Sequence, residues 1–154
     1  MSVTIKTTLN GKSVSANAEP SASLLEFLRD TLEMKGTKLC CNTGECGACT
    51  VIYNGKPINS CVTMAADAIG AEIVTIEGLA DGEKLHPVQQ AFIDTGAVQC
   101  GYCTPGFIMS VKALLDRTKK PTAADIEEAV SGNICRCTGY NKIVDAIHLA
   151  ASKL

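Results

Sequence analysis

The stretch Cys41–Cys49, which reads CNTGECGAC, spaces three cysteines as C-x4-C-x2-C, and Cys61 follows after a gap of eleven residues. This is the plant-type spacing of a [2Fe–2S] site. Two irons bridged by two sulfides need four thiolates in two tetrahedra, so one tight loop can supply three of them and a distant element the fourth. Gly44 and Gly47 lie between the ligands, and we expect positive φ angles there to aim backbone N–H groups at a cluster. The stretch predicts a [2Fe–2S] site made of Cys41, Cys46, Cys49 and Cys61.

Zinc and buried free thiols are the alternatives for this first set. Zinc ligands usually come as two C-x2-C pairs, which the C-x4-C-x2-C spacing does not match. A Rieske centre would need histidine ligands, but neither His86 nor His148 lies next to a cysteine pair. We expect both histidines at helix ends or on the surface. The spacing therefore favours iron–sulfur over zinc.

A second set of four cysteines lies in the C-terminal half. Residues 99–106, QCGYCTPG, contain a C-x2-C pair, and residues 133–140, NICRCTGY, contain a C-x-C pair. Each pair precedes a predicted helix, whose positive end favours an anionic cluster and lowers thiol pKa values. The C-x2-C pair alone also fits a redox dithiol or half of a zinc site. Together with the C-x-C pair it predicts a second cluster, bound by Cys100, Cys103, Cys135 and Cys137.

Two further residues in these loops have an open interpretation. Arg136, between two predicted ligands, either offsets the charge of a cluster or is a solvated side chain. Cys40 directly precedes Cys41 and makes the first ligand ambiguous, because it would give an x5 spacing to Cys46. We interpret Cys41 as the ligand and Cys40 as a packed thiol.

Composition and charge exclude several classes of protein. The 154 residues are 46% hydrophobic and 19% charged, which is typical of a globular chain. A net charge of −2 predicts neither nucleic-acid binding nor a lipid-binding basic run. No apolar stretch approaches the ~18 residues of a membrane span, and we see no export signal. Because the cytoplasm keeps thiols reduced, we expect a cytoplasmic chain whose cysteines bind metal rather than form disulfides.

Residues 1–78 read as strands with one helix. Asn-Gly pairs at 10–11 and 54–55 predict two hairpins, and a last strand is expected over 72–76. Ser23, with Glu26 three residues later, predicts the capping box of a helix that uses apolar residues up to Leu32. This pattern predicts a small α+β fold that carries the first cysteine set.

Residues 79–154 read as helices, after a change of pattern near Gly78–Gly82. Four helices are predicted, and their starts are marked by His86-Pro87, Thr104-Pro105 with Thr104 as the cap, Pro121-Thr122, and Asn141 as a cap. The fold class is therefore predicted as α+β, with one [2Fe–2S] domain over residues 1–78 and a four-helix [2Fe–2S] domain over residues 79–154.

Taken together, these motifs resemble the small iron–sulfur subunits of the molybdenum hydroxylases, the xanthine oxidase family. The resemblance covers nearly the whole chain in the family's order, through Gly36-Thr37-Lys38 followed by residues 41–51, then residues 99–106 and 132–140. One position departs from the pattern, because the family usually has glycine where this chain has Cys40.

The resemblance implies a plant-ferredoxin-like (β-grasp) domain and a four-helix domain, each with one [2Fe–2S] cluster. It implies electron transfer from a molybdenum–pterin centre through the C-terminal cluster, then the N-terminal cluster, to FAD. The pterin cofactor is expected on a large partner subunit and FAD on a medium one, in a dimer of heterotrimers. By similarity, Gln99 and Cys137 would lie against the pterin. The chain itself would be a subunit of an oxidoreductase without substrate chemistry of its own.

Two other functions fit parts of the sequence. A free-standing ferredoxin would carry the same clusters, but such carriers are often strongly acidic for steering to partners, and the net charge here is only −2. A zinc-stapled interaction module would use the same cysteines. No catalytic set is predicted, because carboxylates such as Glu127 and Glu128 fall on an expected solvent face of a helix.

Overall fold

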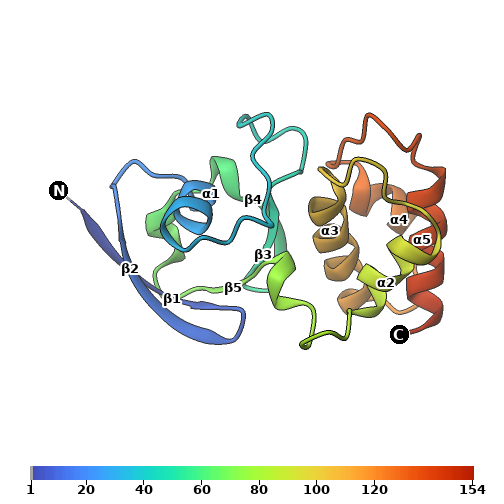
Figure 1. Ribbon diagram of the computed structural model, residues 1–154, viewed down its shortest axis with the longest axis horizontal. Coiled ribbons are helices and arrows are strands. Elements are labelled where there is room, and N and C mark those ends of the chain that lie inside the picture. Colours follow the sequence, from blue (N-terminus) through green and yellow to red (C-terminus); the bar gives the residue numbers. More distant parts are fainter. Residues whose placement is uncertain (1) are drawn as a thin grey trace.

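A mixed five-stranded sheet forms the N-terminal half of the computed structural model, which describes residues 2–154 (Figure 1). The strands are β1 (Val3–Leu9), β2 (Lys12–Ala18), β3 (Thr50–Tyr53), β4 (Lys56–Asn59) and β5 (Glu72–Val74). Their order is β2-β1-β5-β3-β4, with β1 and β5 parallel and the other neighbours antiparallel. Both predicted hairpins are confirmed, because Asn10-Gly11 and Asn54-Gly55 adopt the positive φ angles of tight turns.

One helical segment covers this sheet. α1 (Leu24–Glu26) begins at Ser23 with the predicted capping box, in which the side chains of Ser23 and Glu26 each accept a hydrogen bond from the other's backbone N–H. The segment continues as a π-helical turn over Phe27–Thr31 instead of the regular helix that we predicted. It packs on the sheet in a first hydrophobic core, which includes Leu24, Phe27, Leu28, Ile5, Val51 and Ile73.

Short 3-10 turns lie between β4 and β5 and directly after β5. They cover Ser60–Val62, Ala65–Ala68 and Ile76–Gly78. The last of them explains why β5 ends at Val74 rather than at residue 76, as the sequence predicted. The first of them, which follows β4, carries one of the predicted ligands.

Four helices follow the sheet in the part of the chain that the structure describes. They are α2 (Pro87–Asp94), α3 (Thr104–Arg117), α4 (Ala123–Val130) and α5 (Asn141–Ser152). They enclose a second hydrophobic core around Phe92, Phe107, Leu115 and Ile147. α3 also packs against β3 and β4, so this helix joins the two halves (Figure 1). The predicted α+β order, with strands first and helices second, is confirmed. Over residues 2–154, no helix combines the length and the apolar character needed to cross a membrane.

The helix caps differ from the prediction at two places. Cys103 and Tyr140 occupy the N-cap positions of α3 and α5, so Thr104 and Asn141 are first helical residues rather than caps. Tyr140 takes a left-handed backbone with φ of +70°, which a propensity argument does not foresee because a bulky side chain rarely adopts it. Both shifted caps belong to the predicted cluster loops.

Candidate iron–sulfur centres

The first cysteine set gathers at one end of the β3–β4 hairpin. Cys49 directly precedes β3, and Cys61 lies in the 3-10 turn after β4. The antiparallel register brings these two ends together, and the Ser60 hydroxyl donates to the Cys49 carbonyl at 2.7 Å. Cys49 and Cys61 are buried with Leu25 in a small cluster of their own. The hairpin therefore explains how a distant fourth cysteine reaches the loop that holds the other three.

The loop over residues 41–49 turns backbone N–H groups towards sulfur. The N–H groups of Thr43 and Cys46 each donate to Cys41 Sγ at 3.4 Å. Hydrogen bonds from the Thr43 side chain and backbone, and from Cys46 N–H, lower the pKa of Cys41 to about 5. Gly44 and Gly47 have φ angles of +81° and +67°, the conformation that glycine adopts most easily. The loop thus stabilises a thiolate at Cys41.

The second set comes from two loops that precede helices. Cys100 and Cys103 lie before α3, and Cys135 and Cys137 lie before α5. Burial raises the pKa of Cys103 to about 12, and contact with Cys135 adds to this. Burial also opposes ionisation of Cys135, but hydrogen bonds from the Thr138 side chain and N–H outweigh it and lower the pKa of Cys135 to about 7. The sequence predicted that the two loops share one cluster, and the structure brings their cysteines together.

Within each set the thiols make side-chain contacts in two pairs, with weaker interactions across the pairs. The pairs are Cys41 with Cys46, Cys49 with Cys61, Cys103 with Cys135, and Cys100 with Cys137, whose Sγ atoms are 3.5 Å apart. A [2Fe–2S] cluster takes two protein thiolates on each iron, so a two-by-two arrangement fits it. In metal-free pairs one thiolate disfavours the other, and bound iron would remove this repulsion. Among the side chains of residues 2–154, no three His, Cys, Asp or Glu groups converge as a site for a single metal ion.

Tyr140 supports the second set and was not singled out from the sequence. Its hydroxyl accepts a hydrogen bond from Cys135 N–H at 3.0 Å. Its ring meets Phe107 edge-on, with centroids 6.2 Å apart. Tyr140 itself has a left-handed backbone, with φ of +70°. The motif NICRCTGY contains the tyrosine, but a contact that depends on an unusual φ angle leaves no periodic signal.

The two cysteine loops touch each other across the junction of the two halves. Ile134 N–H donates to the Cys46 carbonyl at 2.9 Å, and the Asn133 side chain donates to the Gly47 carbonyl at 3.0 Å. The Tyr102 hydroxyl, between Cys100 and Cys103, donates to the Leu39 carbonyl. The sequence predicted two sites but not this contact between them.

The remaining predicted positions lie at the surface. Gln99 and Arg136 are exposed, and Cys100 and Cys137 are the exposed members of the second set. Cys40 is also exposed, as is the preceding Leu39, so the expectation of a packed thiol is wrong, because this part of the loop lies at the surface. The expected positions of the histidines are confirmed, since His86 caps α2 and His148 lies on α5.

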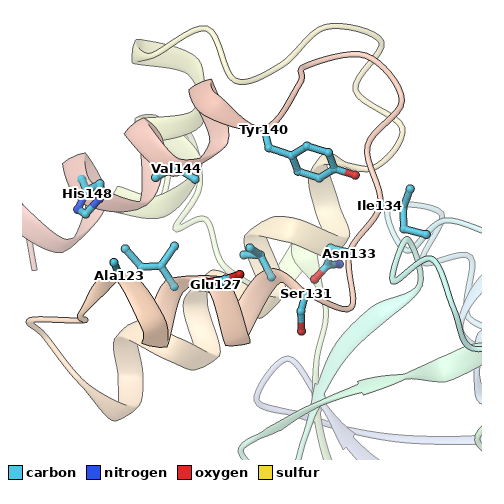
Figure 2. A pocket seen from close by; sticks show the side chains of 10 residues that line it. Ala123, Glu127, Ser131, Asn133, Ile134, Tyr140, Val144 and His148 are labelled. Carbon is cyan, nitrogen blue, oxygen red and sulfur yellow. The ribbon is translucent and has the colours of Figure 1, made fainter.

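A cavity of about 560 Å³ lies between α4 and α5. Figure 2 shows Val144 and His148 of α5 opposite Ala123 and Glu127 of α4, with Tyr140 at the end that leads to the second cysteine loop. The cavity is mostly apolar, and none of the cysteines lines it. The cavity therefore contributes no residue to either cysteine set.

Family models match both halves of the chain. A "[2Fe-2S] binding domain" model matches residues 75–148, and a "2Fe-2S iron-sulfur cluster binding domain" model matches residues 7–72. Each match contains one complete cysteine set.

Similar proteins are subunits or longer chains of oxidoreductases. The chain is 48% identical to the nicotinate dehydrogenase small FeS subunit of Eubacterium barkeri, over 98% of this chain and 96% of that one. It is also 48% identical to the xanthine dehydrogenase iron-sulfur-binding subunit of Escherichia coli O157:H7, over 94% and 92%. Among solved structures, quinoline 2-oxidoreductase from Pseudomonas putida 86 matches with a TM-score of 0.95 and 40% identity, over 99% of this chain and 94% of that chain. Aldehyde oxidoreductase from Desulfovibrio gigas matches with a TM-score of 0.93 and 42% identity, and the chain spans 17% of it.

Proposed function

Because the chain belongs to the family of small iron–sulfur subunits of the molybdenum hydroxylases, we propose that its two cysteine sets bind one [2Fe–2S] cluster each and form a relay between two partner subunits. The chain is an electron-transfer subunit of an oxidoreductase and carries two [2Fe–2S] domains. The observation that carries the proposal is the pairing of thiols two by two in both sets.

The proposed ligands divide by position in the fold. Cys41, Cys46, Cys49 and Cys61 would hold the cluster of the sheet half, and Cys100, Cys103, Cys135 and Cys137 the cluster of the helical half. A bound [2Fe–2S] cluster accepts and releases one electron at a time. The chain supplies thiolates, N–H donors such as those at Cys41, and partial burial, which together set the reduction potential. Gly44 and Gly47 are part of the proposal, as residues whose backbone lets N–H groups approach a cluster.

We propose that the second set faces the subunit with the molybdenum–pterin cofactor. Cys100 and Cys137 are exposed, as is the neighbouring Gln99, so a cofactor on a partner could contact Gln99 and Cys137 directly. Exposed apolar side chains surround this loop region, among them Val98, Tyr102 and Ile134. Such side chains are suited to a protein interface.

We further propose that the first set faces a medium subunit with FAD. Leu39 and Val62, which flank this loop, are exposed apolar residues, and Val62 lies against Gly44. The small subunits of related enzymes imply larger partners, and a dimer of heterotrimers is the assembly that we propose. A domain division at residues 78 and 79 and a cytoplasmic location, where thiols stay reduced, complete the proposal.

Metal analysis tests the ligand assignment. The purified chain should be red-brown, with about four irons and four sulfides per chain. Cys61→Ser and Cys103→Ser should each lower the iron to about two per chain and remove one of two signals in the electron paramagnetic resonance (EPR) spectrum. A colourless protein with stoichiometric zinc would contradict the proposal and favour the zinc module.

Co-purification tests the partners. At native expression the chain should elute together with a large and a medium subunit that contain molybdenum–pterin and FAD. A single species that carries both clusters but no partner would instead favour the free-standing ferredoxin. The two experiments are independent, because the first concerns the cysteines and the second concerns the surface.

A further inference from the structure

The two cysteine loops are joined by main-chain atoms that directly adjoin proposed ligands. The Cys46 carbonyl accepts a hydrogen bond from Ile134 N–H at 2.9 Å, and Ile134 precedes Cys135 in the chain. One hydrogen bond therefore links a residue of the first set to the neighbour of a residue of the second. The rate at which an electron tunnels between two centres falls steeply with their separation, so the spacing of these loops matters for a relay.

Asn133 is the buried side chain that spans this contact. Only 5% of its surface is exposed. Its Nδ2 donates to the Gly47 carbonyl at 3.0 Å, and its Oδ1 accepts from the Ser110 hydroxyl at 2.7 Å. Ser110, on α3, is also buried. The side-chain amide of Asn133 thus connects α3, the second cysteine loop and the first cysteine loop in one network.

The two cysteine loops are closely packed around Asn133. A Cβ atom on Gly47 would lie 2.3 Å from the Gly132 carbonyl and 2.4 Å from Asn133 Nδ2. A Cβ atom on Gly106, at the start of α3, would lie 2.1 Å from the Gly47 carbonyl. The main chain at Gly47 is therefore packed against the main chain of Gly132 on one side and that of Gly106 on the other. The side chain of Asn133 adds a hydrogen bond to this contact, and we call it the clamp.

A purely structural role, in which Asn133 only satisfies a buried carbonyl, is the simpler alternative. The Gly47 carbonyl already accepts hydrogen bonds from the Thr50 hydroxyl at 2.7 Å and from Thr50 N–H at 3.1 Å. It would remain paired without Asn133. The amide is therefore not needed to satisfy that carbonyl, whereas it is the side chain that connects the carbonyl to the helical half.

We propose that Asn133 is a positioning residue that fixes the separation of the two cluster-binding loops. This inference rests on the proposed function, since it takes the two cysteine sets as cluster sites. Asn133→Asp keeps the shape and the bond from Ser110 but turns an acceptor towards the Gly47 carbonyl, so the two loops should move apart. Ser110→Ala is a milder change. It keeps the hydrogen bond from Asn133 Nδ2 to the Gly47 carbonyl but removes the one that Asn133 Oδ1 accepts.

The test is EPR of the full chain, purified with its accompanying subunits and with both clusters reduced. Two paramagnetic centres close together split each other's signals, and the splitting falls with the cube of their distance. We expect Asn133→Asp to narrow or abolish the splitting, and Ser110→Ala to narrow it less, while both keep the iron content of the wild type. Asn59→Ala is the matched control, because Asn59 Nδ2 donates to the Gly44 carbonyl at 2.6 Å within the first domain, and it should retain the splitting.

Two results would overturn the inference. An unchanged splitting in Asn133→Asp with full iron content would show that the loops keep their spacing without the clamp. Loss of iron from both Asn133→Asp and Ser110→Ala would show that the network holds a cluster rather than spacing two. A wild-type chain without iron would instead refute the proposed function, and so the two failures are distinguishable.

Discussion

At the scale of single residues, the adjacent cysteines 40 and 41 differ sharply in their surroundings. Cys41 Sγ accepts two backbone hydrogen bonds at 3.4 Å, which together with the Thr43 side chain lower its pKa to about 5. Cys40 is exposed. A thiolate held by N–H groups is a prepared metal ligand, and so the structure supports Cys41 as the ligand that spacing alone left ambiguous.

We therefore predict that Cys40→Ser keeps both clusters and the iron content of the wild type. Cys41→Ser, the matched variant one residue away, should lose the cluster of the sheet half and about half of the iron. Iron analysis and EPR of the two variants make the measurement. Loss of the ferredoxin-type signal in Cys40→Ser would show that the first ligand is Cys40.

At the scale of elements, α3 depends on a glycine for its approach to the first cysteine loop. A methyl group on Gly106 would meet the Gly47 carbonyl at 2.1 Å, and main chain cannot rotate away. Helix propensity alone would favour alanine over glycine by about 1 kcal/mol. We predict the opposite sign, a destabilisation of about 1–3 kcal/mol from overpacking, measured as a lower Tm of Gly106→Ala.

Gly132→Ala is the control for this substitution. Gly132 lies in the same junction, but a Cβ atom there meets nothing within 4 Å. Its Tm should therefore stay equal to that of the wild type or rise slightly, because alanine restricts the unfolded chain. Equal Tm values for both alanine variants would contradict the close approach of α3 to Gly47.

The start of α2 should respond to pH through His86. Its Nδ1 accepts a hydrogen bond from Val88 N–H at 3.2 Å, which requires the neutral ring. Burial lowers the pKa of His86 below 6.5, and the nearby Lys112 and Lys119 add to this against Asp116. A histidine whose pKa is lower in the folded state stabilises the fold fully above the unfolded pKa, and this contribution is lost as the pH falls through the folded pKa.

His86→Asn should remove this dependence while keeping a cap. The asparagine side chain can accept the same kind of hydrogen bond without titrating. As the pH falls from 7.5 to below 6, the Tm of the wild type should therefore decrease relative to that of His86→Asn. The change should correspond to about 1 kcal/mol of stability, which is a typical value for a cap. Comparing the variant with the wild type at each pH cancels the acid lability of the clusters, which both proteins share. A difference that does not change with pH would exclude this capping role.

At the scale of the whole molecule, the two halves have separate hydrophobic cores, whereas the cysteine loops join them through few side chains. Leu25, Cys49 and Cys61 form a third, small cluster. Bound clusters should therefore stabilise the conformation of the cysteine loops more than the packing of the two hydrophobic cores. Metal ligation contributes folding free energy wherever the site does not exist in the unfolded chain.

We predict that removal of iron exposes the loop between Cys135 and Cys137 to protease while the helices persist. Arg136 is exposed, but with both neighbours bound to iron its peptide bond cannot enter a protease site. Limited trypsin digestion should cut after Arg136 in the iron-free chain and not in the iron-loaded chain. Lys84, exposed in a connection away from both cysteine sets, should be cut equally in both. Equal protection of Arg136 in both forms would contradict the prediction.

The sequence alone determined the features that depend on local spacing. It predicted two sets of four cysteines, both Asn-Gly hairpins, the capping box of Ser23 and Glu26, and strands before helices, because neighbours along the chain decide each of these. The ligand assignments themselves stay predictions. The predicted cap of α5 was wrong by one residue, because Tyr140 occupies the cap position with an unusual φ of +70°.

Only the tertiary structure decided how the two cysteine sets meet. Asn133 and Gly47 are 86 positions apart in the chain, and no periodicity links residues at such a separation. Their contact follows from the packing of α3 on β3 and β4, which brings main chain against main chain at Gly47 and Gly106. The two adjacent cysteines are a second example. Spacing alone allows either Cys40 or Cys41 as the first ligand, whereas the folded loop directs two N–H groups at the sulfur of Cys41, which favours Cys41.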